Sequence, residues 1–188
     1  MDMLTEDYIM RMINQALAVF LAALGLKKAG KYDQALQTFD QAIENLLGLN
    51  AHLVDQLDDK TLLDRLTFLG KLDVDRLVVL ADIFREEAEV YSSLRQPQRS
   101  QLAAERSLRL FLEAILVNDA NLTTELIQKV EPLRQKVANI SLPIETRLAL
   151  QDYLDRLLAR GDDFLAQNGL LREDLKLALS SLDSMVRY

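Results

Sequence analysis

Apolar residues recur every three or four positions along most of the chain, which is the spacing that gives an α-helix one buried face. Glycine, proline and polar turn residues interrupt the pattern and mark the connections between helices. We expect helices at about 5–29, 32–47, 73–94, 97–117, 143–161 and 171–187, short helical pieces within 49–72, and a helix that Pro132 kinks or breaks.

The segment 16–26 is almost wholly apolar and needs a separate interpretation. At about 11 residues it is shorter than the roughly 20 needed to span a membrane. The residues before it, 1–7, are acidic, whereas a secretory signal begins with basic residues. We therefore expect a helix buried nearly all round and no membrane partner.

Composition supports an all-helical chain. Leucine occupies 40 of the 188 positions, while glycine and proline together occupy nine. Strong helix formers with few helix breakers favour an all-α fold. No linker or low-complexity tract divides the sequence, so residues 1–188 are expected to form a single domain. The absence of cysteine fits a reducing compartment, and we expect a cytoplasmic protein.

One phrase, residues 30–43, predicts a helical hairpin. Gly30 suits the end of the preceding helix, because glycine readily adopts the left-handed conformation found there. Ala35, Phe39 and Ala42 then follow at helical spacing on one face. Small residues at this spacing allow two antiparallel helices to approach closely.

This phrase resembles the second half of a tetratricopeptide repeat (TPR), a helical motif that builds binding scaffolds. The resemblance is good over residues 17–47. It is degenerate over 81–112, where Arg95 replaces the hairpin glycine and Glu87 replaces a leucine, and weak over 143–168.

The opening phrase at 7–13, Asp-Tyr-Ile-Met-Arg-Met-Ile, together with the first repeat is also similar to an uncharacterised bacterial family of TPR-like proteins. The resemblance implies antiparallel helical hairpins in a right-handed array. The helix at 171–187 would cap that array. No activity follows from it.

The chemical inventory of the sequence is small. The net charge of −7 and the absence of a basic run argue against nucleic-acid binding. His52 is the only histidine, so no multi-histidine metal site is expected. No glycine-rich phosphate-binding motif is present. We therefore expect no catalytic residue, metal or cofactor.

In a TPR the first helix of each hairpin lines the concave binding surface, and the resemblance places a groove there. Its apolar floor and basic lip come from the first repeat, and Arg85 and Glu89 continue the face in the second. The first-repeat positions are Leu17, Phe20, Leu24, Lys27 and Lys28. Another helix of the chain, a second copy of the chain or an amphipathic partner helix could fill this groove.

The favoured function is a non-enzymatic scaffold or regulator that binds a protein or peptide helix, or itself. The alternative is a small-molecule sensor or enzyme with a polar site around Arg85, Glu89 and Tyr91. We expect a homodimer, because the first helix is apolar on more faces than one hairpin covers. Phe20→Asp or Leu182→Asp is then expected to loosen the dimer or unfold the chain.

Overall fold

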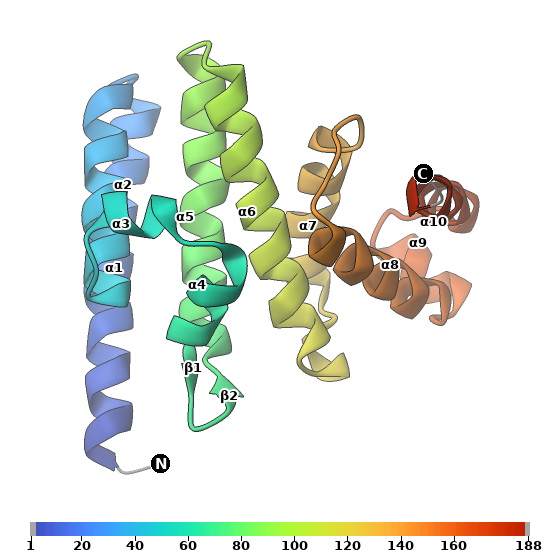
Figure 1. Cartoon of the computed structure of the whole chain (residues 1–188), viewed down its shortest axis with the longest axis horizontal. Helices are drawn as coiled ribbons and strands as arrows, with labels where there is room; N and C mark the ends of the chain where they lie inside the picture. The colour runs from blue at the N-terminus through green and yellow to red at the C-terminus, as the bar shows by residue number, and fades with distance from the viewer. Residues whose placement is uncertain (1–2, 187–188) are drawn as a thin grey trace. The chain divides into compact units, whose positions relative to one another are not determined.

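The computed structural model describes residues 3–186, with side chains for 7–118 and 120–182. It confirms an all-α fold with one short β-hairpin (Figure 1). The helices are α1 (Met3–Lys28), α2 (Tyr32–Leu47), α3 (Ala51–Gln56), α4 (Asp59–Arg65), α5 (Val74–Ser93), α6 (Pro97–Leu116), α7 (Thr124–Lys136), α8 (Ile144–Leu158), α9 (Asp162–Gln167) and α10 (Arg172–Val186). The strands are β1 (Thr67–Phe68) and β2 (Lys71–Leu72), and a 3₁₀ turn covers Asp119–Asn121. Arg187, in the expected last helix, lies outside the described residues.

The chain divides into two compact units, residues 1–110 and 111–188. The boundary falls inside α6, between Leu110 and Phe111. A continuous helix carries no change of composition at such a point. For this reason a search for linkers in the sequence does not detect it.

The first unit begins with the antiparallel pair α1 and α2. Gly30 has φ +72°, and the chain reverses there through hydrogen bonds from Gly30 N–H to the Lys27 carbonyl and from Lys31 N–H to the Leu26 carbonyl. Residues at the contact between the helices are small or aromatic and fully buried. They are Ala16, Ala23, Ala35, Phe39 and Ala42.

The second pair, α5 and α6, is joined by a turn of the same kind at Arg95, whose φ is +56°. Two serines of α6 face α5. Ser100 Oγ donates a hydrogen bond to the carbonyl of Ala88 at 2.6 Å, and Ser107 Oγ donates to the carbonyl of Ala81 at 2.7 Å. Small side chains thus allow close packing in both hairpins.

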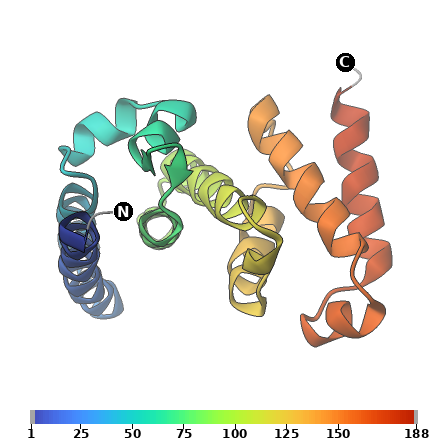
Figure 2. The same ribbon diagram turned by 90° about the horizontal axis from the view of Figure 1, so that it is seen from below.

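Between the two hairpins, α3 and α4 cross from α2 to α5 and α6 (Figures 1 and 2). The side chains of Asn50, Asp58 and Asp73 accept hydrogen bonds at the starts of α3, α4 and α5. The hairpin of β1 and β2 was not expected from the sequence. Its turn places Leu69 and Gly70 at positive φ, and its strands have only two residues each.

The second unit contains α7 to α10. Helix α7 continues through Pro132, so the break that the sequence allowed at this residue does not occur. The proline is exposed, and its neighbours Glu131 and Leu133 are buried. Glu131 accepts hydrogen bonds from Arg134, at 2.6 Å, and from the Tyr153 hydroxyl, at 3.0 Å. Burial and the Glu131 carboxylate raise the pKa of Tyr153. Helix α10 packs on α8.

Candidate functional site

The predicted groove residues lie on α1 and α5, and most of them already contact other residues of the chain. Lys27 forms ion pairs with Glu86, at 2.5 Å, and with Glu89, which tie α1 to α5. Arg85 joins the same cluster through Glu86 at 3.0 Å and also pairs with Asp82. Charge pairs therefore fill the polar end of this face.

The apolar groove positions have different surroundings. Phe20 is 8% exposed and packs against Phe39 of α2, so it belongs to the hairpin core and does not form an open groove floor. Leu17 and Leu24 are half-buried, and Lys28 is exposed. The position of Phe20 follows from the direction of α2, which covers the face that carries it.

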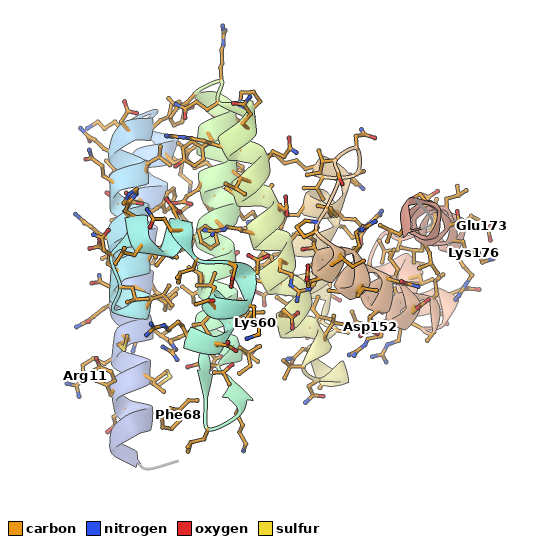
Figure 3. All side chains as sticks on the ribbon, in the orientation of Figure 1. Arg11, Lys60, Phe68, Asp152, Glu173 and Lys176 are labelled. Atoms are coloured by element: carbon orange, nitrogen blue, oxygen red, sulfur yellow. The ribbon has the colours of Figure 1, made fainter. Side chains whose placement is uncertain are left out.

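Helix α1 is not buried all round, contrary to the expectation for segment 16–26. Its buried stripe consists of Ile13, Ala16, Phe20 and Ala23. The opposite side is exposed and apolar. We call this side the α1 outer face and define it by Ala18, Leu21, Ala22 and Gly25. Arg11 marks the same side of the helix and projects away from α5 (Figure 3).

Two features of the outer face are unusual for an exposed helix surface. Leu21 is 64% exposed. Gly25 lies within the helix, where glycine costs about 1 kcal/mol relative to alanine, yet a Cβ built at this position meets no atom within 4 Å. Packing within the described chain therefore gives no reason for glycine at this position.

By length and composition, the 22 residues Asp7–Lys28 could also cross a membrane, with 22% of the relevant window buried. This stretch is longer than the 11 apolar residues considered from the sequence. Core helices and signal sequences meet the same criterion. A functional test of α1 must therefore include a membrane.

A cavity of about 290 Å³ opens elsewhere in the first unit, among α3, α5 and α6. We call it the Glu87 pocket. Helix α5 contributes one wall, and the end of α3 and the first turns of α6 contribute the others. It is lined by His52, Asp55, Phe84, Glu87, Tyr91, Arg99, Leu102, Ala103 and Arg106.

Glu87 is the buried acidic group of this pocket, with 7% of its surface exposed. Among the described residues, neither a hydrogen bond nor an ion pair reaches its carboxyl group. Burial, reinforced by the carboxylates of Asp40 and Asp55, raises the pKa of Glu87 well above its usual value. Partial burial, with Asp55 and Glu44 nearby, raises the pKa of Asp40 as well.

The two arginines of the pocket differ in how they are held. Arg106 donates to the main-chain carbonyls of Val54, Asp55 and Leu57 at 3.3, 3.1 and 2.5 Å, and its side chain lies over the ring of Phe84. It therefore fixes the end of α3. Arg99 lies 5.7 Å from the Tyr91 ring centre and is exposed.

Tyr91 is the residue of this pocket that the sequence also places in a candidate polar site. Burial is the main cause that raises the pKa of Tyr91 to about 12, so its hydroxyl is protonated at neutral pH. The other two residues of that hypothesis, Arg85 and Glu89, lie in the ion-pair cluster with Lys27. Glu87 was missed as a site residue, although its sequence signal was visible as a carboxylate in the apolar stripe between Phe84 and Ala88.

A second, more open groove of about 450 Å³ lies between the start of α1 and the β-hairpin. Ile9 and Met10 of α1 and Phe68 of β1 supply its apolar walls, and Phe68 is labelled in Figure 3. In the second unit, a small cavity of about 50 Å³ lies against α8 and α10 and includes Leu182. Leu182 therefore packs within its own unit.

Residues 7–118 and 120–182 contain no group of three histidine or acidic side chains placed to hold a metal ion. Comparison of the chain with protein-family models, with curated proteins and with solved structures finds no match.

Proposed function

We propose that the chain is a non-enzymatic protein-interaction module built from TPR-like helical hairpins, and that it forms a homodimer through the α1 outer face. The observation that carries the proposal is the exposed apolar surface of Ala18, Leu21, Ala22 and Gly25 on a helix whose other side is buried. Exposed apolar surface of this kind commonly marks an interaction site.

The TPR-like part of the proposal is supported by the two hairpins. Gly30 and Arg95 occupy equivalent turns, each at positive φ and each following a long first helix. Both hairpins also place small residues at the contact, such as Ala35 in the first and Ser107 in the second. These are the positions at which the repeat motif requires small side chains.

A second copy of α1 fits the outer face in both shape and charge. Ala18, Ala22 and Gly25 have side chains small enough for another helix to approach closely. In an antiparallel pair centred near Ala18, Asp7 of one chain lies near Lys28 of the other, because the two residues are almost equally far from the centre. A two-fold axis then pairs opposite charges at both ends.

Light scattering tests this proposal directly. The parent protein is expected to have twice the 21.4 kDa mass of one chain at micromolar concentration. Leu21→Glu is expected to give a folded monomer, because it places a charge in the centre of the interface. Leu177→Glu is the matched control, since Leu177 is 67% exposed and Leu21 is 64% exposed.

Three results would contradict the proposal. The first is a parent monomer at high micromolar concentration, and the second is a Leu21→Glu dimer. The third is binding of the parent protein, but not of Leu21→Glu, to phosphatidylcholine vesicles. Such binding would assign the outer face to a membrane.

A further inference from the structure

Glu87 is an acidic group without a partner in the interior of the first unit. The residue is 7% exposed, and the described chain offers its carboxyl group no hydrogen-bond donor and no ion-pair partner. A buried charged carboxylate without a partner is strongly disfavoured, and even a neutral one forgoes hydrogen bonds to water. Because its side chain lines a cavity of about 290 Å³, a ligand in that cavity could supply the missing donor.

The charges around the cavity favour a cation. Asp55 and Glu87 are the acidic lining residues, Arg99 and Arg106 are the basic ones, and the carboxylate of Asp40, outside the lining, also acts on Glu87. With Glu87 ionised, these five groups carry one net negative charge. One bound positive charge restores neutrality, whereas an anion would leave the Glu87 carboxylate without a counter-charge.

Arg106, the arginine whose charge acts on Glu87, cannot pair with it without losing its own hydrogen bonds. Arg106 already donates to three carbonyl oxygens at the end of α3 and lies near Asp55 at 3.7 Å. Turning it toward Glu87 would break these three hydrogen bonds. Arg99 lies over the Tyr91 ring and is exposed to solvent.

The cavity also indicates which kind of cation fits. No trio of acidic or histidine side chains in the described residues is placed to hold a metal ion, so an organic cation is favoured. An ammonium group has three donors and forms short, charge-assisted hydrogen bonds with a carboxylate. The volume of about 290 Å³ far exceeds the roughly 10–15 Å³ that one water needs, so an alkyl chain can accompany the ammonium group.

We propose that the Glu87 pocket binds an alkylammonium group, with the Glu87 carboxylate as its counter-ion and the Tyr91 hydroxyl as a second polar contact. The apolar lining of Phe84, Leu102 and Ala103 packs against the alkyl chain. The source of the ammonium group is a free amine or a lysine side chain of another protein. This site is independent of the α1 outer face.

The test uses n-butylammonium as the probe, with n-butanol and butyrate as its neutral and anionic counterparts, and reads backbone amide shifts by NMR. We expect n-butylammonium to give saturable shifts around Glu87 and Tyr91, and the two counterparts to bind at least tenfold more weakly. An Nα-acetyl-lysine amide distinguishes the sources. Tenfold tighter binding than n-butylammonium assigns the site to a lysine side chain, and equal or weaker binding assigns it to a free amine.

Glu87→Gln keeps the shape of the side chain and removes its charge, and it is expected to weaken n-butylammonium binding at least tenfold. Glu105→Gln is the control, because Glu105 is a half-buried glutamate of the same unit that does not line the pocket. Equal binding of n-butanol and n-butylammonium, or no saturable binding, would overturn the proposal even if Glu87→Gln failed to fold. Unchanged binding to folded Glu87→Gln would also overturn it.

Discussion

The rings of Phe20 and Phe39 lie 5.9 Å apart, at an interplanar angle of 42°, in the contact between α1 and α2. Both side chains are buried, and an aromatic pair at this distance stabilises a fold beyond its buried area. Phe20 therefore belongs to the hairpin core, whereas the resemblance to the repeat placed it on the floor of a candidate binding groove. The neighbouring Leu21 lies about 100° further around the helix, on the α1 outer face, where it is exposed.

This relationship predicts that Phe20→Ala lowers the free energy of unfolding by about 3–5 kcal/mol, because it leaves a cavity against Phe39. Leu21→Ala removes a side chain of similar volume from the exposed side and is expected to cost less than about 0.5 kcal/mol in the isolated chain. Urea denaturation followed by circular dichroism measures both. Equal losses for the two variants would show that Phe20 does not hold the hairpin together.

The positive φ angles at Gly30 and Arg95 predict that substitutions at these two turns change stability in opposite directions. Both residues have positive φ, which costs a side chain with a Cβ about 1–2 kcal/mol. Gly30→Val should therefore destabilise the first hairpin, and Arg95→Gly should stabilise the second by about 1 kcal/mol. Melting temperatures that move in the same direction for the two variants would contradict the equivalence of the turns.

The small residues at the α1–α2 contact predict a steric effect. Ala42 is fully buried there, so Ala42→Leu should overpack the contact and cost about 1–3 kcal/mol. Gln41→Leu adds bulk at the adjacent, exposed position of the same helix and is expected to change stability by less than about 0.5 kcal/mol. Chemical denaturation of the two variants compares them directly, and an Ala42→Leu variant as stable as the parent would argue against close packing.

The raised pKa of Glu87 predicts a pH-dependent gain of stability on substitution. A carboxyl whose pKa is higher in the folded state binds its proton more tightly there, so its ionisation increasingly destabilises the fold as pH rises above the ordinary value of 4.5. Glu87→Gln removes this penalty. Its melting temperature should exceed that of the parent at pH 8, and the difference should shrink toward pH 4.5.

Glu125→Gln is the control for this series, since the Glu125 side chain is 75% exposed and lies in the other unit. Its melting temperature relative to the parent is expected to change little between the two pH values. A gain from Glu87→Gln that is the same at pH 4.5 and pH 8 would show that ionisation of Glu87 is not the cause.

Much of the local structure could be predicted from the sequence because it is encoded by neighbouring residues. Helix α2 begins at Tyr32 and ends at Leu47, as the turn at Gly30 and the stop at Gly48 predict. Asp58 and Asp73 cap the helices that follow them. The short β-hairpin could not be predicted, because Leu69 occupies a turn position that normally requires glycine or asparagine.

The candidate sites could not be predicted from local sequence patterns, because they depend on how distant helices pack together. A sequence shows that α1 is apolar on every side, but only the position of α2 shows which side is covered. Glu87 carried a signal, as a carboxylate where the repeat has leucine. Its significance depends on whether a partner reaches it, and Arg106, a basic residue of the same pocket, is held by the end of α3.

Disulfide formation between single cysteines tests the α1 outer face most directly, because the parent chain contains no cysteine. In the proposed antiparallel dimer, Ala18 of one chain lies beside Ala18 of the other, so Ala18→Cys should form a covalent dimer under mild oxidation. Ala166→Cys places a cysteine at an exposed position of α9 and should remain mostly without a covalent cross-link. Rapid, nearly complete cross-linking of Ala18→Cys alone is the predicted result, and equal cross-linking of both variants, or none of Ala18→Cys, would contradict the proposed interface.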